Sequence, residues 1–163
     1  MARGIVLTDA SPLIGLARVD GLPWLKALFG EVWMPQEVRR EVLADKGYPE
    51  ENLILRAEAG NWLKTCAASP TQPEFADLDE GEASCIRIAL AQPLPALLLM
   101  DERAGRAVAT ERGLRVAGTA AVIGMAQSKR LIPSARDVFE RLHSSDFRIS
   151  AQVIHAVLRR LGE

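Results

Sequence analysis

The sequence has 163 residues, a length that fits one domain, and its 48% apolar and 25% charged residues are typical of a globular protein. This composition excludes a chain that is mainly disordered. The formal net charge is −1, so the chain lacks the strongly positive field of very basic nucleic-acid-binding proteins. Net charge alone therefore neither supports nor excludes a nucleic-acid partner.

The chain contains two histidines and two cysteines, and the cysteines form no CxxC pair. A structural zinc site needs about four nitrogen or sulfur ligands at close spacing, which this pattern does not provide. We expect Cys66 and Cys85 to be small buried apolar residues, although a disulfide stays open. No stretch approaches the ~18 apolar residues of a membrane helix, so we expect a cytoplasmic protein without a membrane partner.

Short apolar runs alternate with amphipathic segments along the chain. The expected strands are residues 5–7, 32–34, 62–66, 97–100 and 114–117. The expected helices begin after Ser11 as N-cap, at Leu22, at Gln36, near Glu50, at Asp79, at Glu102 and after Thr119, with two more near 134–142 and 150–161. Strands that alternate with helices predict an α/β fold with three layers, in which helices cover both faces of a central parallel five-stranded sheet.

The pattern shows no internal repeat and no domain linker. We therefore expect residues 1–163 to form a single domain, with a core over 1–132 and a C-terminal helical extension over 133–163. Three tryptophans, Trp24, Trp33 and Trp62, lie in apolar segments and are expected in the core. The chain therefore offers no obvious aromatic platform for single-stranded nucleic acid.

Acidic residues follow two of the expected strands at the point where each ends. Asp9 comes after the first strand and Asp101 after the fourth, and binding crevices in parallel sheets lie at these carboxyl ends. Glu82 falls in the first turn of a helix, and Glu41 falls inside the helix after the second strand. Carboxylates are the ligands that Mg²⁺ and Mn²⁺ prefer, and such ions can activate water against a phosphodiester.

Each acid also has a purely structural interpretation. Asp9 and Asp101 could each cap the helix that follows, and Asp79 with Glu82 has the spacing of a capping box. Glu41 could be a solvated residue on an amphipathic helix. Spacing alone does not decide between these interpretations and a metal site.

The order of four motifs adds further information. They are Leu7-Thr8-Asp9-Ala10-Ser11-Pro12-Leu13-Ile14, Val32-Trp33-Met34-Pro35 with Val38 and Glu41, Leu78-Asp79-Glu80-Gly81-Glu82-Ala83, and Leu98-Leu99-Met100-Asp101-Glu102. Together they resemble the PIN-domain superfamily, and in particular a branch related to the VapC-type toxins of toxin–antitoxin pairs. The resemblance covers residues Ile5 to Ile132.

The resemblance implies one metal site for Mg²⁺ or Mn²⁺, which is also the catalytic site. Its ligands would be Asp9, Glu41, Glu82 and Asp101. The third acid is often Asp in the toxins, so the longer Glu82 departs from the pattern and could alter the metal distance.

Further residues are carried over from the resemblance or from their position. Ser11 matches a small hydroxyl residue beside the first Asp, and Glu102 is the nearest candidate for an additional acid. Thr119 is expected to orient water or phosphate. Arg103 and Arg106 could contact nucleic-acid phosphate, or could lie on a solvated helix face.

The function that the resemblance implies is metal-dependent cleavage of RNA, which leaves a 5′-phosphate and a 3′-hydroxyl. It also implies a homodimer and, for a toxin, a small antitoxin protein as partner. Two other functions are alternatives. An aspartyl-phosphate phosphatase of the haloacid dehalogenase class needs a second Asp two positions after the first, where this chain has Ser11. A degenerate PIN fold could instead bind nucleic acid or protein without catalysis.

Overall fold

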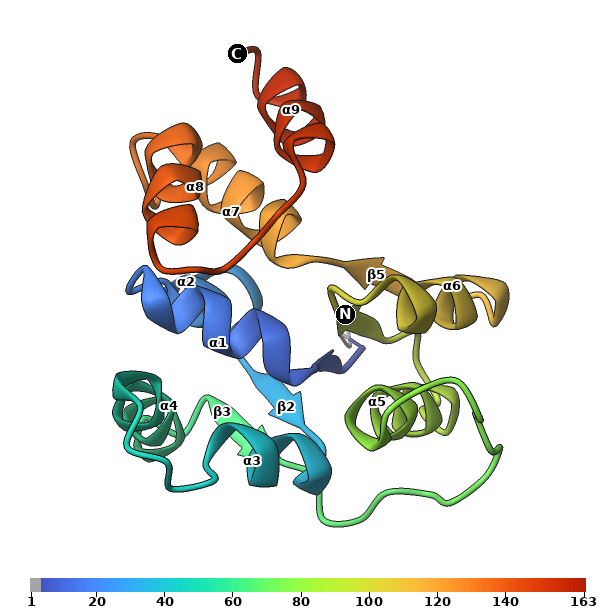
Figure 1. Cartoon of the computed structure of the whole chain (residues 1–163). Helices are drawn as coiled ribbons and strands as arrows, with labels where there is room; N and C mark the ends of the chain where they lie inside the picture. The colour runs from blue at the N-terminus through green and yellow to red at the C-terminus, as the bar shows by residue number, and fades with distance from the viewer. Residues whose placement is uncertain (1–3) are drawn as a thin grey trace.

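The protein was analysed as a computed structural model, which describes residues 4–163. The strands are β1 (Val6–Thr8), β2 (Val32–Met34), β3 (Leu63–Thr65), β4 (Leu97–Leu99) and β5 (Arg115–Ala117) (Figure 1). The helices are α1 (Ala10–Arg18), α2 (Leu22–Phe29), α3 (Gln36–Val42), α4 (Pro49–Ala59), α5 (Glu80–Leu90), α6 (Arg103–Glu111), α7 (Thr119–Ser128), α8 (Ala135–Ser144) and α9 (Ala151–Arg160). All five expected strands are present, with bounds that differ by at most one residue.

The five strands form one sheet in the order β3-β2-β1-β4-β5, and every pair is parallel. The central strand β1 pairs with β4 in the register Thr8↔Leu99. Leu7, Leu98 and Leu99 are completely buried, as expected for parallel strands that are covered on both faces. The predicted parallel five-stranded sheet is therefore confirmed.

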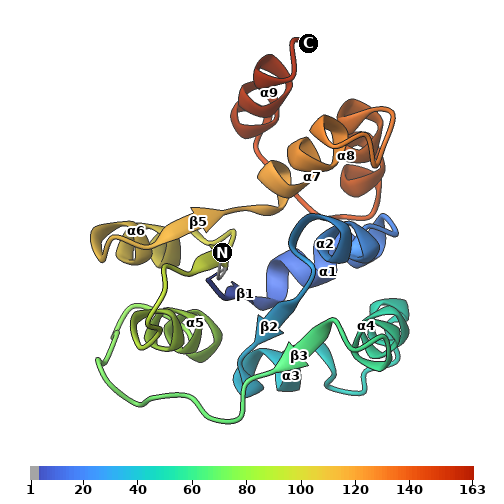
Figure 2. The same ribbon diagram turned by 180° about the vertical axis from the view of Figure 1, so that it is seen from behind.

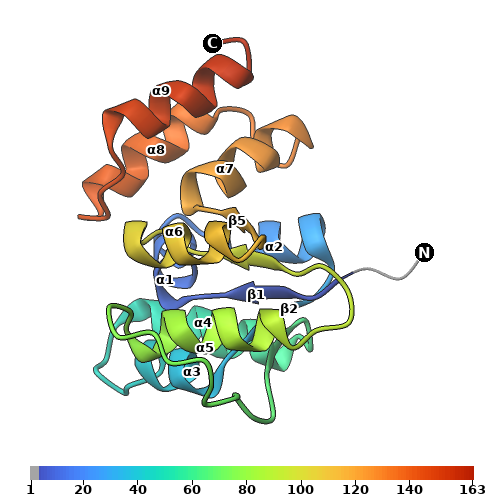
Figure 3. The same ribbon diagram turned by 90° about the vertical axis from the view of Figure 1, so that its right-hand side faces the viewer.

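Helices cover both faces of this sheet. Figure 1 shows α5 and α6 on one side of the strands and α1, α2 and α4 on the other, and in Figure 3 α8 and α9 lie beyond α7, away from β1 and β2. Seen from behind in Figure 2, β5 runs beside α6 and β3 lies near α4. The arrangement confirms the expected three-layer α/β/α architecture.

The start of the first helix differs from expectation. We expected Ser11 to be the N-cap, but α1 begins at Ala10 with Asp9 in the cap position. Ser11 lies inside the helix, and its hydroxyl donates a hydrogen bond of 2.8 Å to Asp101 Oδ2. The contact is made across the sheet edge by a residue 90 positions away, which local capping rules do not consider.

The last two helices pack on α7, and both begin with a serine cap. Ser134 Oγ accepts from Asp137 N–H, and Ser150 Oγ accepts from Val153 N–H. The apolar stripe of α9 is only partly covered, since Leu158 is buried while Val153 is 46% exposed. α9 is therefore attached along one edge of its apolar face.

Several smaller expectations are also resolved. Cys66 and Cys85 are free and buried, and Trp62 is buried while Trp24 and Trp33 pack partly covered against the core. Among residues 4–163, no helix combines the length and apolar character needed to cross a membrane.

The burial of β4 generates a stability prediction. Leu98→Ala should lower the free energy of unfolding by about 2–5 kcal/mol, because it opens a cavity in a completely buried strand. Leu55→Ala, at a position that is 46% exposed in α4, should cost less than about 1 kcal/mol. Urea unfolding measures both. Equal losses for the two variants would contradict the placement of β4 at the centre of the core.

Candidate active site

Two aspartates lie side by side at the carboxyl ends of the central strands. Asp9 follows β1, Asp101 comes shortly after β4, and the Asp9 backbone N–H donates to Leu99 O at 2.9 Å. From β1 the chain first adds β2 and β3 on one side of the sheet. It then crosses to the other side of β1, where it adds β4 and β5. Crevices form at such a switch in strand order. The fold therefore brings residues 92 positions apart to one place.

Asp9 is a buried acid, with only 4% of its surface exposed. The pKa of its carboxyl is raised to about 7, chiefly by burial and also by the negative charges of Asp79, Glu41 and Asp101, while a hydrogen bond from the Ala10 backbone lowers it. Its side chain makes no capping bond to α1. Asp9 therefore occupies the N-cap position of α1 without a side-chain capping bond, and its carboxyl is buried next to other acids.

Glu82 and Asp79 form a second acidic pair at the start of α5. Asp79 Oδ1 accepts a hydrogen bond of 2.8 Å from Glu82 N–H, so Asp79 is the N-cap. Burial raises the pKa of Glu82 to about 8, helped by its side-chain hydrogen bond with Asp79 and by the charges of Asp79, Asp9 and Glu102. The capping box is thus half formed: Asp79 caps the helix, while the Glu82 carboxyl faces other acids.

Asp101 is held by three hydrogen bonds from residues on two other elements. Its Oδ1 accepts from Thr119 N–H at 2.7 Å, and its Oδ2 accepts from the hydroxyls of Ser11 at 2.8 Å and Thr119 at 2.7 Å. Thr119 is the first residue of α7, where a helix favours negative charge. Asp101 does not cap its own helix α6, because Glu102 occupies that position and makes no side-chain cap bond.

Ser11 and Thr119, which the sequence suggested as accessory residues, both fix the orientation of Asp101. Glu102 is exposed and acts on the site through its charge near Glu82. The predicted arginines differ from each other. Arg106 donates from Nη1 to Met100 O at 3.0 Å and lines a pocket together with Asp101, whereas Arg103 is exposed and does not line that pocket.

Glu41 is the outermost of the predicted acids. It is exposed on α3, and its pKa is raised by partial burial and by the charge of Asp79, while Lys46 lowers it. The charge of Glu41 also raises the pKa of Asp9. Glu41 therefore belongs to the same electrostatic group, and the acid whose charge raises its pKa is Asp79.

Sequence reasoning assigned Asp79 only a capping role, yet its charge acts on Asp9, Glu41 and Glu82 alike. The clue in the sequence was its position at the start of α5, because a residue that caps this helix could also face the crevice at the strand ends.

Small residues make room for the acids. A Cβ added to Gly81 would lie 2.9 Å from Asp9 Oδ1, and one added to Gly105 would lie 2.6 Å from Glu82 Oε2. α5 and α6 therefore approach these carboxylates more closely than larger residues would allow. This close approach buries the side chains of Asp9 and Glu82, and the burial raises their pKa values.

The donor set fits a hard divalent cation in its chemistry, because it offers carboxylate oxygens that would lose their mutual repulsion around a positive charge. Within residues 4–163, however, no three acidic, histidine or cysteine side chains lie close enough to hold a metal ion as they stand. Metal binding would therefore require the carboxylates to move toward one another.

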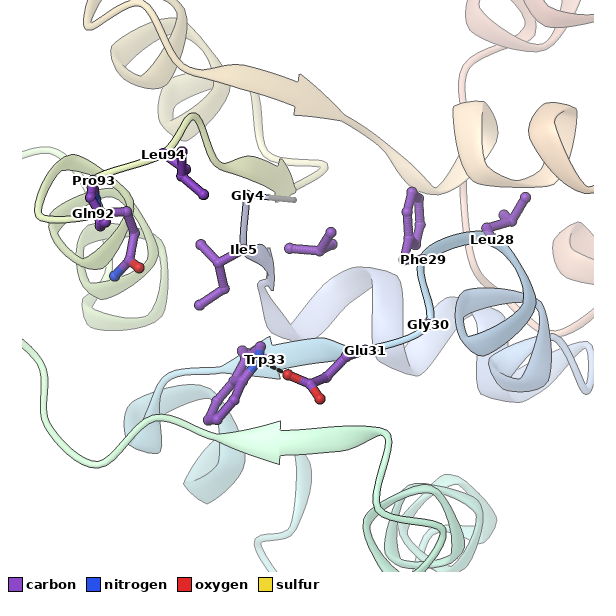
Figure 4. A pocket seen from close by; sticks show the side chains of 11 residues that line it. Gly4, Ile5, Leu28, Phe29, Gly30, Glu31, Trp33, Gln92, Pro93 and Leu94 are labelled. Carbon is purple, nitrogen blue, oxygen red and sulfur yellow. Dashed lines mark hydrogen bonds between the residues drawn. The ribbon is translucent and has the colours of Figure 1, made fainter. Parts of the chain in front are cut away.

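A second hollow lies at the opposite, amino ends of the strands. This pocket of about 610 Å³ is bordered by residues that precede β1, β2 and β4, among them Ile5, Phe29 and Leu94 (Figure 4). Its acid, Glu31, is paired with Lys64 at 2.9 Å and accepts from the Trp33 indole at 2.7 Å. Hydrogen bonds from Lys64 and then Trp33 lower the pKa of Glu31. It therefore lacks the buried, mutually repelling acids of the other edge.

The raised pKa of Asp9 generates a pH prediction. Folded Asp9 keeps its proton to about pH 7, whereas an unfolded Asp loses it near 3.8, so the folded state binds more protons between these values. Without metal, stability should therefore fall as pH rises from about 4 to 7, and Glu82 should extend the fall toward 8.

Asp9→Asn should remove the contribution of Asp9 to this fall. In the presence of a chelator, the variant should be more stable than the unsubstituted protein at pH 8 by on the order of 1–3 kcal/mol, and the difference should shrink to near zero at pH 4. Urea unfolding at the two pH values measures this. The opposite result, in which Asp9→Asn is less stable than the unsubstituted protein at pH 8 but not at pH 4, would show that Asp9 is ionised and well paired.

Comparisons with known proteins agree with the architecture. A search of curated proteins returned no significant match. The family described as DUF3368: PIN domain matches residues 5–163, a region that includes α8 and α9. Because the match covers nearly the whole chain, this protein belongs to the PIN-domain family.

Proposed function

We propose that the chain is a metal-dependent endoribonuclease, and that Asp9, Glu41, Asp79, Glu82 and Asp101 form its active site. PIN domains are generally nucleases, and they generally use divalent metals. The observation that carries the proposal is the burial of Asp9 and Glu82 next to other acids, which raises their pKa values to about 7 and about 8. Such perturbed acids in a crevice are typical of functional sites.

Asp9, Glu82 and Asp101 are the residues that would hold Mg²⁺ or Mn²⁺, with Glu41 and Asp79 at the outer side. The bound ion would supply an activated water and would neutralise charge on the phosphodiester. The chain's own contribution is positional. Ser11 and Thr119 hold the Asp101 carboxylate in one orientation, so this ligand loses little freedom when a cation binds.

Asp9 and Glu82 contribute through their protons. Both carry a proton over part of the neutral range in the absence of a cation, and both must release it to act as ligands. Cation binding should therefore become tighter as pH rises toward 8. The proposed reaction is hydrolysis of an RNA phosphodiester, which leaves a 5′-phosphate on one product and a 3′-hydroxyl on the other.

The proposal extends to a toxin that is held inactive by a small antitoxin and that forms a homodimer, as the VapC-type resemblance implies. A small DNA-binding protein encoded in the neighbouring gene would support the toxin role. Light scattering of the purified protein measures its oligomeric state.

A second function is favoured by one observation. Since no three potential ligands within the described residues 4–163 lie close enough for metal as they stand, the fold could serve as a binding module without catalysis. Absence of Mn²⁺ binding at millimolar concentration in calorimetry would favour this function over the first.

Substitution of the two strand-end aspartates tests the proposed function. Asp9→Asn and Asp101→Asn should each lower Mg²⁺- or Mn²⁺-dependent RNA cleavage by about 100-fold or more, because each removes an anionic oxygen ligand while nearly preserving shape. Asp20→Asn is a matched control: Asp20 is exposed, follows the C-terminal end of α1 while Asp9 precedes its N-terminal end, and has φ of 54°, which Asn tolerates. Cleavage is followed on a labelled RNA by gel electrophoresis. Full activity in both active-site variants would show that the site lies elsewhere.

A further inference from the structure

A pocket of about 710 Å³ opens directly beside Asp101. It lies between α6, α7, α9 and the linker of residues 146–150, which runs from α8 to α9 (Figure 1). Its volume is in the range of ligand-binding pockets in proteins. We call this pocket the α9 groove.

One end of the α9 groove belongs to the candidate active site. Ser11, Asp101 and Glu102 line that end, and Ser11 donates its hydrogen bond to Asp101 there. Anything that reacts at Asp101 therefore has open space next to it, on the side of α9.

The rest of the groove is lined by small and apolar residues together with three arginines. Arg106, Arg148 and Arg160 come from α6, the linker and α9, with Asp146 as the acid among the remaining lining residues. Across residues 4–163, none of these arginines forms an ion pair, although four other basic side chains do. Arg106 is engaged with Met100 O, whereas Arg160 is exposed. Their charges are thus available to an anion in the groove.

We propose, on the basis of the proposed function, that the α9 groove binds the phosphate backbone of single-stranded RNA next to the cleaved bond, with Arg148 and Arg160 as phosphate contacts. A strand whose phosphodiester lies at Asp101 has to continue away from it, and the groove is the adjoining space. Its next phosphates then meet guanidinium groups, which bind phosphate through charge-assisted hydrogen bonds.

The groove should bind RNA with little dependence on base sequence. Phe147 is the aromatic residue that lines it, but a Cβ at Gly15 would lie 2.7 Å from the Phe147 ring, so this ring is packed on α1. Base stacking on Phe147 is therefore restricted, and contacts to the backbone dominate. Binding that depends on phosphate contacts weakens steeply with salt.

Removal of the two arginines gives a quantitative expectation. Each phosphate contact to a single strand contributes about 0.7 to the slope of log affinity against log salt, which corresponds to about fourfold in affinity at ~0.15 M salt. The double variant Arg148→Gln/Arg160→Gln should therefore bind RNA about 15-fold more weakly, with a slope smaller by about 1.4.

The matched control is Arg136→Gln/Arg159→Gln. It removes the same charge from α8 and α9 at exposed positions that do not line the groove, and Arg159 is the immediate neighbour of Arg160. Its affinity should change less than about twofold. Thermal unfolding of both double variants checks that each retains the fold.

Binding of a short labelled single-stranded RNA is measured by fluorescence anisotropy over a range of salt concentrations, with Ca²⁺ as the cation and the RNA checked for cleavage on a gel. A selective loss in the groove variant would support the proposal. Equal affinity in the two double variants, or binding of poly-glutamate but not RNA by the unsubstituted protein, would overturn it. RNA that is bound through the groove but never cut with Mg²⁺ or Mn²⁺ would overturn the proposed function and leave the groove assignment standing.

Discussion

The parallel pairing of β1 with β4 is the contact on which the candidate site depends. It brings Asp9 and Asp101 together beside a backbone hydrogen bond from Asp9 to Leu99, and α1 and α7 carry the hydrogen-bond donors to Asp101, which are Ser11 and Thr119. Because the sheet core is fully buried here, the acids cannot withdraw into solvent without moving the strands. The interior packing of the sheet thus forces negative groups together at its edge.

This arrangement opposes stability. Buried carboxyl groups near other acids lose hydration and repel one another when ionised, so the folded chain keeps protons on Asp9 and Glu82. A structural role would not need such a cluster, since Asp79 alone caps α5 and Asp101 alone satisfies the first turn of α7. A cation that replaces the protons removes the conflict, and this is the physical reason to interpret the edge as a metal-dependent site.

Much of the fold could be predicted from the sequence, because strand-length apolar runs and helix-breaking residues are local features. The run Leu97–Leu99 and the helix starts at Leu22 and Gln36 are examples. Contacts between residues that are distant in the sequence were harder to predict. Ser11 looked like a helix cap, because its true partner Asp101 is distant in sequence. The influence of Asp79 was missed for a similar reason, since the acids that it affects come from other segments. The α9 groove also depends on how the last helix packs, which periodicity does not specify.

The most direct test of the account is calorimetric titration of Mn²⁺ at pH 7 in two buffers that differ in ionisation enthalpy. If Asp9 and Glu82 exchange protons for a cation, binding should release protons, and the heat should therefore differ between the buffers. Asp9→Asn should weaken binding and reduce the proton release. Mn²⁺ binding without any proton release, or the same release in Asp9→Asn, would contradict the claim that these buried acids form the metal site.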